Sequence, residues 1–491
     1  QHDKALKNPC SNVAMTDTAE PRKVAVFVFP GAAGHVNPSL PMCRRFIELG
    51  WEVEYVCNPS FQKSIEDTGA QFRDVNLICG KYGDITDLRA MIVKSLEEYE
   101  DPGAKTWALN FGSIATERLI PIFAAYFKDI SPKLLVYCPV LCPYAHFAAT
   151  FLHPFPTVSL LTAAGPGYWD AAFRVHGGSA AQLTEAIQRN APNQMAVQNI
   201  RKMLQVEKMS LNTSEPLVQD YYTSLNLVTT LPSLADACSE KDAGVYFAQG
   251  KKFEFVGPLL EAPPVPEAMN PEEMSKLFQD IKEAKAAGKE IVYVSMGTVL
   301  TGNHEEYGWN GRAGDTALTG KELCHGVFGA VFKELGKSDG EAGPLVILAV
   351  GPQPDALPFE APPNCRCFPT LPQVELLQCA QDALAFSVTH GGQNSFMECL
   401  SVASPLLVCP GFGDQQSNAA RAEALKLGVK VDRPKTGDDG AMEAYGMAVS
   451  KALQTMCSSK DIYHAAARTL AEEIRHAGGV RRAVDLILES L

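Results

Sequence analysis

The sequence predicts an α/β protein built from two doubly wound, Rossmann-like domains with a ligand cleft between them. Three observations lead to this fold class. The chain has 491 residues, too many for one ordinary core. Short apolar segments alternate with segments of helical periodicity, as in parallel sheets that are covered on both faces. A proline-rich stretch interrupts this alternation near the middle of the chain, and the alternation then restarts.

The first half opens with a strand, a loop and a helix. Val24 to Phe29 reads VAVFVF, a β-branched and aromatic run, and the loop PGAAGHVNP follows it. Apolar residues at helical spacing then continue to Gly50. Further strands are expected at WEVEYVC (51–57), KLLVYCPV (133–140) and PTVSL (156–160). This half is therefore expected to hold the first parallel sheet.

The second half begins after five prolines that fall between Pro258 and Pro271, a composition that indicates a linker. Strands are then expected at 290–298, 344–351, 365–368, 383–388 and 405–410. The polar, glycine-rich segment 302–320 is expected to be a surface insertion. The predicted division is a polar tail at 1–22, an N-terminal domain at 23–257, a linker at 258–272 and a C-terminal domain at 273–470.

The composition limits the classes of partner. Lys and Arg total 43 against 56 Asp and Glu, a formal net charge of −13, so nucleic acid is not an expected partner. The 14 Cys are scattered without a C-x-x-C pair, a pattern typical of reduced thiols in a cytoplasmic protein. The N-terminal stretch lacks the apolar core of a signal peptide, and the apolar segment 134–152 is interrupted by prolines. We therefore expect a cytoplasmic location and no stable membrane insertion.

The stretch THGGQNSFMECLSVASPLLVCPGFGDQQSN, residues 389–418, has the features of a diphosphate site. It follows a predicted strand, and Gly391 and Gly392 allow a ligand to approach the backbone closely. Asn394 and Ser395 then offer donors at the positive end of a helix. A Gly-Gly turn with an Asn or Ser cap also occurs without any ligand.

Acidic and amide side chains follow the same turn. Glu398 lies one helical turn beyond Asn394, where a carboxylate can accept hydrogen bonds from two ribose hydroxyls. Asp414 and Gln415, expected in the loop after the next strand, can bind sugar hydroxyls. The ordered series of His, Gly-Gly, Asn-Ser, Glu and Asp-Gln favours a nucleotide-sugar site over a simple capped turn.

The segment 371–429, from LPQVELL to ALKLGV, resembles the donor-binding signature of the UDP-dependent glycosyltransferases. These enzymes have the GT-B fold and include plant natural-product and bacterial macrolide glycosyltransferases. The resemblance implies that His390, Asn394 and Ser395, beside Gly392, hold the diphosphate. It also implies that Glu398 binds the ribose, that Asp414 and Gln415 bind the hexose, and that the loop of Thr298 faces the phosphates.

The base-binding position departs from the family pattern. The family usually has a Trp three residues before the Gln of its Pro-Gln pair, where the ring stacks on uracil. This chain has Thr370 there, before Gln373, which the resemblance places among the donor-binding residues. Phe368 is the candidate replacement for the ring, and a nucleotide other than a uridine nucleotide is left open.

His35 is the candidate general base. It is expected in the loop after the first strand, before a helix capped by Asn37 with Pro38 in its first position. A neutral imidazole is suited to removing an acceptor proton near pH 7. The family's catalytic histidine lies in the same G-H-x-N-P context, and the alternative is a loop histidine with a local capping role.

The family usually orients this histidine with an Asp, and the matching position here is Cys138. A neutral thiol neither fixes the tautomer as firmly nor stabilises an imidazolium. Two explanations are open: the acceptors are phenols that need little help, or another carboxylate reaches His35 in space. Core packing of Cys138 is compatible with either.

Aromatic residues of the first half suggest a pocket for a lipophilic acceptor. The candidates are Met91, Trp107, Phe111, Tyr168, Trp169 and Phe173. The resemblance further implies inversion at the anomeric carbon, and a C-terminal helix, 471–491, that packs back onto the first domain.

The resulting prediction is an inverting transferase that moves a hexose, with glucose as the expected sugar, from a UDP-sugar to a small apolar acceptor. Neither a metal nor another cofactor is expected, because backbone amides at a helix start can carry the diphosphate charge. The alternatives are a sterol or lipid glycosyltransferase of the same fold and a non-catalytic sugar-nucleotide-binding protein.

Overall fold

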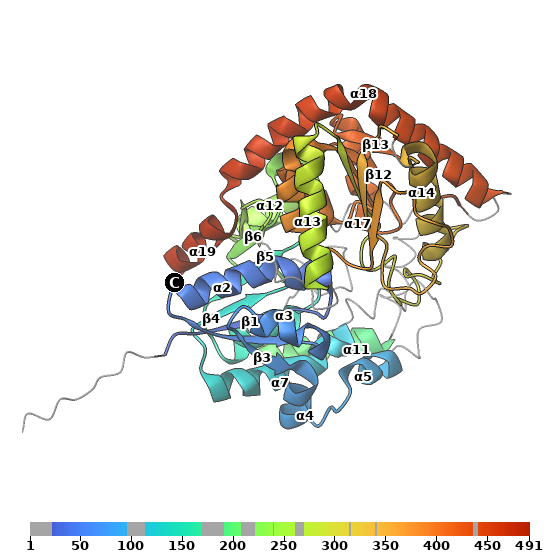
Figure 1. Ribbon diagram of the computed structural model, residues 1–491. Coiled ribbons are helices and arrows are strands. Elements are labelled where there is room, and N and C mark those ends of the chain that lie inside the picture. Colours follow the sequence, from blue (N-terminus) through green and yellow to red (C-terminus); the bar gives the residue numbers. More distant parts are fainter. Residues whose placement is uncertain are drawn as a thin grey trace, which may run out of the picture.

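The computed structural model describes residues 22–95, 113–168, 191–207, 221–238, 240–260, 270–313, 316–338, 341–435 and 440–491. The predicted tail at 1–22, apart from Arg22, and much of the predicted linker at 258–272 lie outside these residues. The described chain forms two parallel sheets, each covered by helices (Figure 1). The predicted fold class, two Rossmann-like halves, is confirmed.

The first sheet has seven strands in the order β3-β2-β1-β4-β5-β6-β7, all parallel. Its strands are β1 Val24–Val28, β2 Glu52–Cys57, β3 Gln71–Asp74, β4 Leu134–Tyr137, β5 Thr157–Leu161, β6 Leu225–Val228 and β7 Lys252–Phe255. All five residues of β1 are buried because helices cover both of its faces. The chain reverses its direction of growth at β1, so the loops after β1 and β4 meet at one edge of the sheet.

The second sheet has six strands in the order β10-β9-β8-β11-β12-β13, also all parallel. Its strands are β8 Ile291–Ser295, β9 Leu345–Ala349, β10 Cys365–Phe368, β11 Leu384–Thr389, β12 Leu406–Val408 and β13 Gly428–Lys430. Here the direction of growth reverses at β8, which places the loops after β8 and β11 side by side. The two sheets thus repeat one topology.

Helices connect the strands of both sheets. In the first half they are α1 Ala33–Val36, α2 Leu40–Glu48, α3 Gln62–Glu66, α4 Val75–Gly83, α5 Leu88–Ser95, α7 Ser113–Ile130, α8 Pro143–Phe147, α11 Ala191–Leu204 and α12 Glu240–Ala248. In the second half they are α13 Pro271–Ala286, α14 Gly320–Leu335, α15 Gln373–Ala380, α16 Gln393–Ser401, α17 Asp414–Ala424, α18 Ala441–Ala477 and α19 Gly479–Ser490. Within the described part of the chain, none of these helices combines the length and the hydropathy needed to cross a bilayer.

The last two helices join the halves. α18 runs along the outside of the second half, and α19 lies beside α2 of the first half (Figure 1). Gly478 (φ +91°) and Gly479 (φ +53°) make the sharp turn between them, a conformation that suits glycine. Beyond this turn, Val484 and Ile487 are buried in the core of the first half. The end of the chain therefore fastens the second half to the first.

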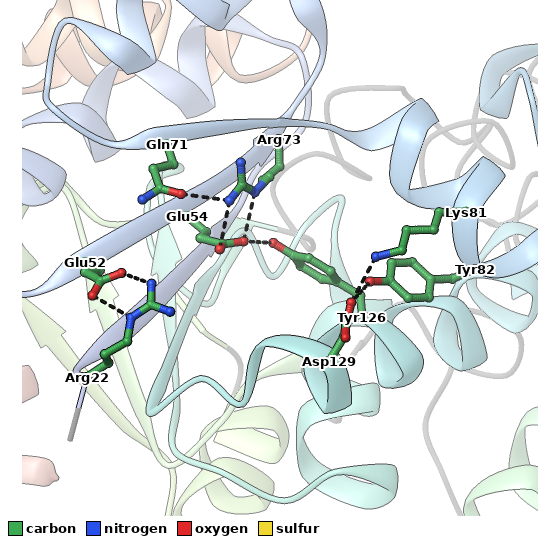
Figure 2. Close-up of polar contacts among 9 residues, drawn as sticks. All are labelled: Arg22, Glu52, Glu54, Gln71, Arg73, Lys81, Tyr82, Tyr126 and Asp129. Atoms are coloured by element: carbon green, nitrogen blue, oxygen red, sulfur yellow. Dashed lines mark hydrogen bonds and ion pairs between the residues drawn. The ribbon is translucent and has the colours of Figure 1, made fainter.

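A buried carboxylate ties the outer strands of the first sheet to α7. Glu54 of β2 is 9% exposed. Its carboxylate accepts two hydrogen bonds from the Arg73 guanidinium, from Nη2 to Oε1 at 3.0 Å and from Nε to Oε2 at 3.1 Å (Figure 2). The Tyr126 hydroxyl of α7 donates to the same carboxylate at 2.5 Å. The ion pair and the hydrogen bonds offset the desolvation penalty of the buried carboxylate.

The segment 302–320 is not the surface insertion that its composition predicts. Trp309 is 2% exposed and belongs to the core of the second half, and its Nε1 donates to Asp355 Oδ1 at 2.9 Å. Gly308 packs so tightly that a Cβ there would lie 2.5 Å from the backbone of His304. The glycines therefore serve close backbone packing around a buried tryptophan.

Candidate active site

His35 follows the carboxyl end of β1, the central strand of the first sheet. It lies in α1, a single helical turn that continues through η1 Asn37–Ser39 into α2. The predicted cap is therefore wrong: Asn37 has helical φ and ψ, and its side chain makes no capping bond. The helix begins at Ala33, five residues before the predicted first position at Pro38, because no residue between Ala33 and Val36 prevents helical geometry.

Two neutral side chains contact the ring of His35. Cys138, directly after β4, places its Sγ 3.4 Å from His35 Nδ1, as expected for the residue at the family's Asp position. Thr162, directly after β5, places its Oγ1 2.9 Å from the same nitrogen. Sequence analysis missed Thr162, which lies 127 positions from His35. The sequence feature that could have identified Thr162 is its position directly after β5, the strand that pairs with β4.

Burial sets the protonation of this group. It lowers the pKa of His35 to about 4 and raises the pKa of the Cys138 thiol to about 12. Both side chains are therefore neutral at pH 7. A neutral imidazole has one nitrogen with a free lone pair, which is the state that a general base requires.

The predicted diphosphate turn joins β11 to α16. The helix begins at Gln393, one residue before the predicted start, so Asn394 and Ser395 lie in its first turn. The ring of His390 packs closely on glycine backbone, and a Cβ on Gly297 or Gly392 would lie 2.4 Å from it. Glycine is thus required at both positions, and the turn stays open to a ligand at the positive end of α16.

His390 itself is held neutral in this turn. Burial lowers its pKa to about 4, although a backbone hydrogen bond with Ser295 opposes this shift. Its Nδ1 is buried and makes no hydrogen bond among the described residues, so this nitrogen is available to a ligand or a water molecule.

Gln373 organises the next part of the site. Its side-chain amide donates to Ser395 Oγ at 3.1 Å and to the Glu398 carboxylate, while its Oε1 accepts from the Tyr293 hydroxyl at 2.7 Å. Three residues predicted from the sequence, Gln373, Ser395 and Glu398, are thereby brought together. Burial raises the pKa of Glu398 to about 7, although the Gln373 hydrogen bond opposes this.

Asp414 and Gln415 begin a helix and do not lie in a loop as predicted. Gly413 (φ +58°) turns the chain directly into α17, where an acidic residue in the first turn is favourable. Burial raises the pKa of Asp414 to about 6. Gln415 is buried, and its Oε1 accepts from the amides of Gly411 and Phe412 at 2.8 and 3.2 Å. Gln415 thus shapes the turn that presents Asp414.

The remaining donor candidates lie at the same edge of the second sheet. Thr298 is exposed in the turn after β8. Phe368 ends the edge strand β10 and is half-buried against the second half's core. Phe368 lies at the carboxyl end of its strand, and Thr298 follows the carboxyl end of β8, as the turn before α16 follows that of β11.

The two halves meet at these strand ends. The Asn394 side chain donates to the Gly34 carbonyl at 3.3 Å, so the diphosphate turn touches the residue before His35. A second link joins Arg421 of α17 to Asp236 of the first half at 2.5 Å, with both side chains largely buried. Sequence analysis missed this ion pair, because neither residue belongs to a recognisable motif.

The acceptor side is described only in part. Trp107, Phe111, Trp169 and Phe173 lie outside the described residues. Met91 is half-buried on α5, and Tyr168 packs against the core of the first half. The pKa of Tyr168 is raised, first by burial and then by the carboxylates of Asp414 and Asp236. Tyr168 therefore lies near the predicted hexose site.

A cavity of about 760 Å³ opens elsewhere, against the amino ends of β5, β6 and β7. None of the predicted site residues lines it. In doubly wound sheets ligands bind at the carboxyl ends of the strands, near the reversal of strand order. The converging polar groups, and not the size of this cavity, therefore locate the candidate active site.

Comparisons with known proteins agree with this location. Residues 349–464 match the family model described as UDP-glucoronosyl and UDP-glucosyl transferase, a range that holds β11, α16 and α17. The chain is 22% identical over 492 residues to the NDP-glycosyltransferase YjiC of Bacillus licheniformis, covering 95% of this chain and 97% of that protein.

Solved structures share the fold. The glycosyltransferase of kitacinnamycin superposes with a TM-score of 0.60 at 20% identity, covering 96% of this chain and 100% of that one. The glycosyltransferase VinC, solved in complex with DTDP, gives a TM-score of 0.58 at 14% identity, covering 95% and 98%. At these identities the likeness shows a common GT-B architecture of two Rossmann-like halves.

Proposed function

We propose that this chain, which has the GT-B fold, is a UDP-glycosyltransferase that moves a hexose, with glucose as the first candidate, from a UDP-sugar to a hydroxyl group of a small lipophilic acceptor. The observation that carries the proposal is the hydrogen bond from Asn394 to the Gly34 carbonyl. It places a helix start suited to a diphosphate beside the backbone that presents His35. Transfer to an acceptor hydroxyl requires both a bound donor and a general base beside it.

The donor is assigned to the second half. Its diphosphate binds at the start of α16, on the side chains of Asn394 and Ser395 and on backbone amides, and no metal is needed to balance the charge. Glu398 accepts the ribose hydroxyls, and Asp414 accepts hydroxyls of the hexose. Phe368 supplies the ring for the base. VinC binds DTDP, so a thymidine nucleotide is the alternative donor to test.

The acceptor is assigned to the first half, above His35. The acceptor hydroxyl loses its proton to the imidazole and attacks the anomeric carbon from the face opposite the leaving UDP, which inverts that centre. Tyr168 and Met91 supply part of an apolar wall. Phenolic, polyketide and macrolide-like compounds suit such a wall, and the kitacinnamycin glycosyltransferase is a structural neighbour.

The test is UDP release from UDP-glucose and dTDP release from dTDP-glucose, with phenolic, macrolide and sterol acceptors. We expect acceptor-dependent release that falls about a hundredfold or more in His35→Ala, the size typical of a lost general base. His476→Ala, which removes an exposed histidine of α18, is the matched control and is expected to behave as wild type. Tight nucleotide binding without release from any acceptor would refute transfer and support a sugar-nucleotide-binding role.

A further inference from the structure

The side chains around the His35 ring come from three neighbouring strands. β1, β4 and β5 are adjacent in the first sheet, and His35, Cys138 and Thr162 follow their carboxyl ends. This order brings the Thr162 hydroxyl to 2.9 Å and the Cys138 sulfur to 3.4 Å from one ring nitrogen, Nδ1. Both partners lack a charge at pH 7, whereas a carboxylate is the usual partner of a catalytic histidine.

We propose that Thr162, assisted by Cys138, is the positioning residue that keeps the His35 proton on Nδ1, and that this neutral pair restricts transfer to acceptors with an acidic hydroxyl group, such as phenols. The inference rests on the proposed function, because it concerns the role of His35 in that transfer.

The hydroxyl of Thr162 is the stronger of the two partners. Its distance of 2.9 Å is that of a good hydrogen bond, and a hydroxyl oxygen can accept the Nδ1 proton. Thr162 is 7% exposed, so water does not compete freely for this contact. A thiol at 3.4 Å is a weaker acceptor. With the proton held on Nδ1, the lone pair of Nε2 is free for the acceptor.

The reaction step then balances as follows. The acceptor hydroxyl gives its proton to Nε2, and its oxygen forms a bond to the anomeric carbon. The bond between that carbon and the phosphate oxygen breaks, and UDP leaves with the electron pair. The products are the glycoside, UDP and an imidazolium that returns its proton to solvent. The step needs no oxidant or further reactant.

The missing charge determines which acceptors react. As His35 becomes an imidazolium, its Nδ1–H faces a hydroxyl dipole and a thiol, and among the residues that the structure describes no carboxylate shifts the pKa of the ring to offset the burial of the new positive charge. Burial already lowers the pKa of His35 to about 4. Transfer of a proton to so weak a base is strongly unfavourable for an aliphatic alcohol and much less so for a phenol.

The kinetic test measures kcat and KM with UDP-glucose, or with whichever of the two donors is used, for para-substituted phenols and for benzyl alcohol. Wild type is expected to lose activity steadily as the acceptor becomes less acidic. Thr162→Val keeps the side-chain shape and removes the hydroxyl, so kcat for the least acidic phenols should fall about tenfold to a hundredfold with little change in KM. Thr162→Ser restores the hydroxyl and should recover kcat to within about threefold.

A charged partner should reverse the selection. Cys138→Asp places a carboxylate near Nδ1 and is expected to raise kcat for benzyl alcohol more than kcat for nitrophenol. Equal losses for all acceptors in Thr162→Val, or wild-type turnover of benzyl alcohol as fast as of phenols, would overturn the proposal. Absence of transfer in wild type with every donor and acceptor would instead refute the proposed function.

A measurement without turnover separates these failures. Long-range ¹H–¹⁵N spectra of protein with ¹⁵N-labelled histidine report the tautomer of each ring, and His35→Gln identifies the signals of His35. The Nδ1–H tautomer is expected in wild type and in Thr162→Ser, and a mixed or inverted population in Thr162→Val. An unchanged tautomer in Thr162→Val would overturn the positioning role even if transfer is observed.

Discussion

Glu54 and Glu398 are two carboxylates that the fold withdraws from water in opposite ways. Glu54, in the first sheet, is bound by the Arg73 guanidinium and the Tyr126 hydroxyl (Figure 2). Glu398, beside the second sheet, receives one hydrogen bond from Gln373, and burial raises its pKa to about 7. The fold supplies a cation for Glu54, whereas in the part of the chain that the structure describes no cation pairs with Glu398.

The difference separates a structural carboxylate from a functional one. A buried carboxylate with a cation and a hydroxyl is stable in the free protein and has little left to offer a ligand. A carboxylate with a raised pKa gains from further donors, such as the two hydroxyls of a ribose. Replacing Glu54 should therefore lower stability and leave UDP affinity unchanged, whereas replacing Glu398 should lower UDP affinity and should not lower stability.

The largest effect is expected from Glu54→Gln. The variant removes the charged acceptor of the Arg73 guanidinium, which is 39% exposed, and of the buried Tyr126 hydroxyl, and losing these charge-assisted hydrogen bonds is expected to lower the free energy of unfolding by about 3 kcal/mol. Urea unfolding measures this loss, and the affinity for UDP should stay at the wild-type value. Glu52→Gln is the matched control on the same strand, because its pair with Arg22 is exposed and its loss should change stability little. A weaker UDP affinity in Glu54→Gln would contradict the assignment of Glu54 as a structural carboxylate.

The fold, too, has parts that the sequence predicts and parts that it does not. The strands with strong apolar runs, such as β1 and β8, are predictable, whereas β3, β6, β7 and β13 escape because strands of three or four residues outside a longer apolar run carry little periodicity. Glu54 gives no signal either, since Arg73 and Tyr126 become its partners only through strand pairing and helix packing.

The candidate site also has one part that the local sequence predicts and one part that depends on the order of the strands. Donor residues from His390 to Glu398 are contiguous, and local helix geometry alone brings Ser395 and Glu398 onto one face. Thr162 is different, because its contact with His35 depends on the order of β1, β4 and β5 in the sheet. That order is not encoded locally, so the residue was missed although the fold class was correct.

The second effect in size is expected from Glu398→Gln. Replacing a carboxylate that accepts two ribose hydroxyls by an amide should weaken UDP binding about thirtyfold, or about 2 kcal/mol, within the range for hydrogen bonds to charged groups. Titration calorimetry with UDP measures it, and Glu423→Gln, an exposed change in α17, is the control.

Unlike Glu54→Gln, the Glu398→Gln variant should not lower the stability of the protein. The pKa of Glu398 is higher in the folded protein than in the unfolded chain, so the folded protein ionises less readily. The free energy of unfolding therefore decreases as the pH rises from the unfolded pKa of 4.5 to the folded pKa of about 7. At pH 8 the amide avoids this loss, so Glu398→Gln is expected to melt no lower than wild type. A variant that melts lower and binds UDP normally would make Glu398 a structural residue like Glu54.

The smallest effect is the dependence of UDP affinity on pH. Ribose hydroxyls bind the ionised form of Glu398, whose pKa in the free protein is about 7. As pH falls from 8 to 6, the ionised fraction drops about tenfold, and the affinity should fall with it because only that fraction is competent. UDP titrates in the same range, with a phosphate pKa of about 6, so the informative quantity is the affinity of wild type divided by that of Glu398→Gln at each pH. UDP without the hexose is the appropriate probe, since it leaves Asp414, with a pKa of about 6, out of contact. A ratio that stays constant from pH 6 to 8 would mean that Glu398 does not titrate against the ribose, and the contrast with Glu54 would then rest on stability alone.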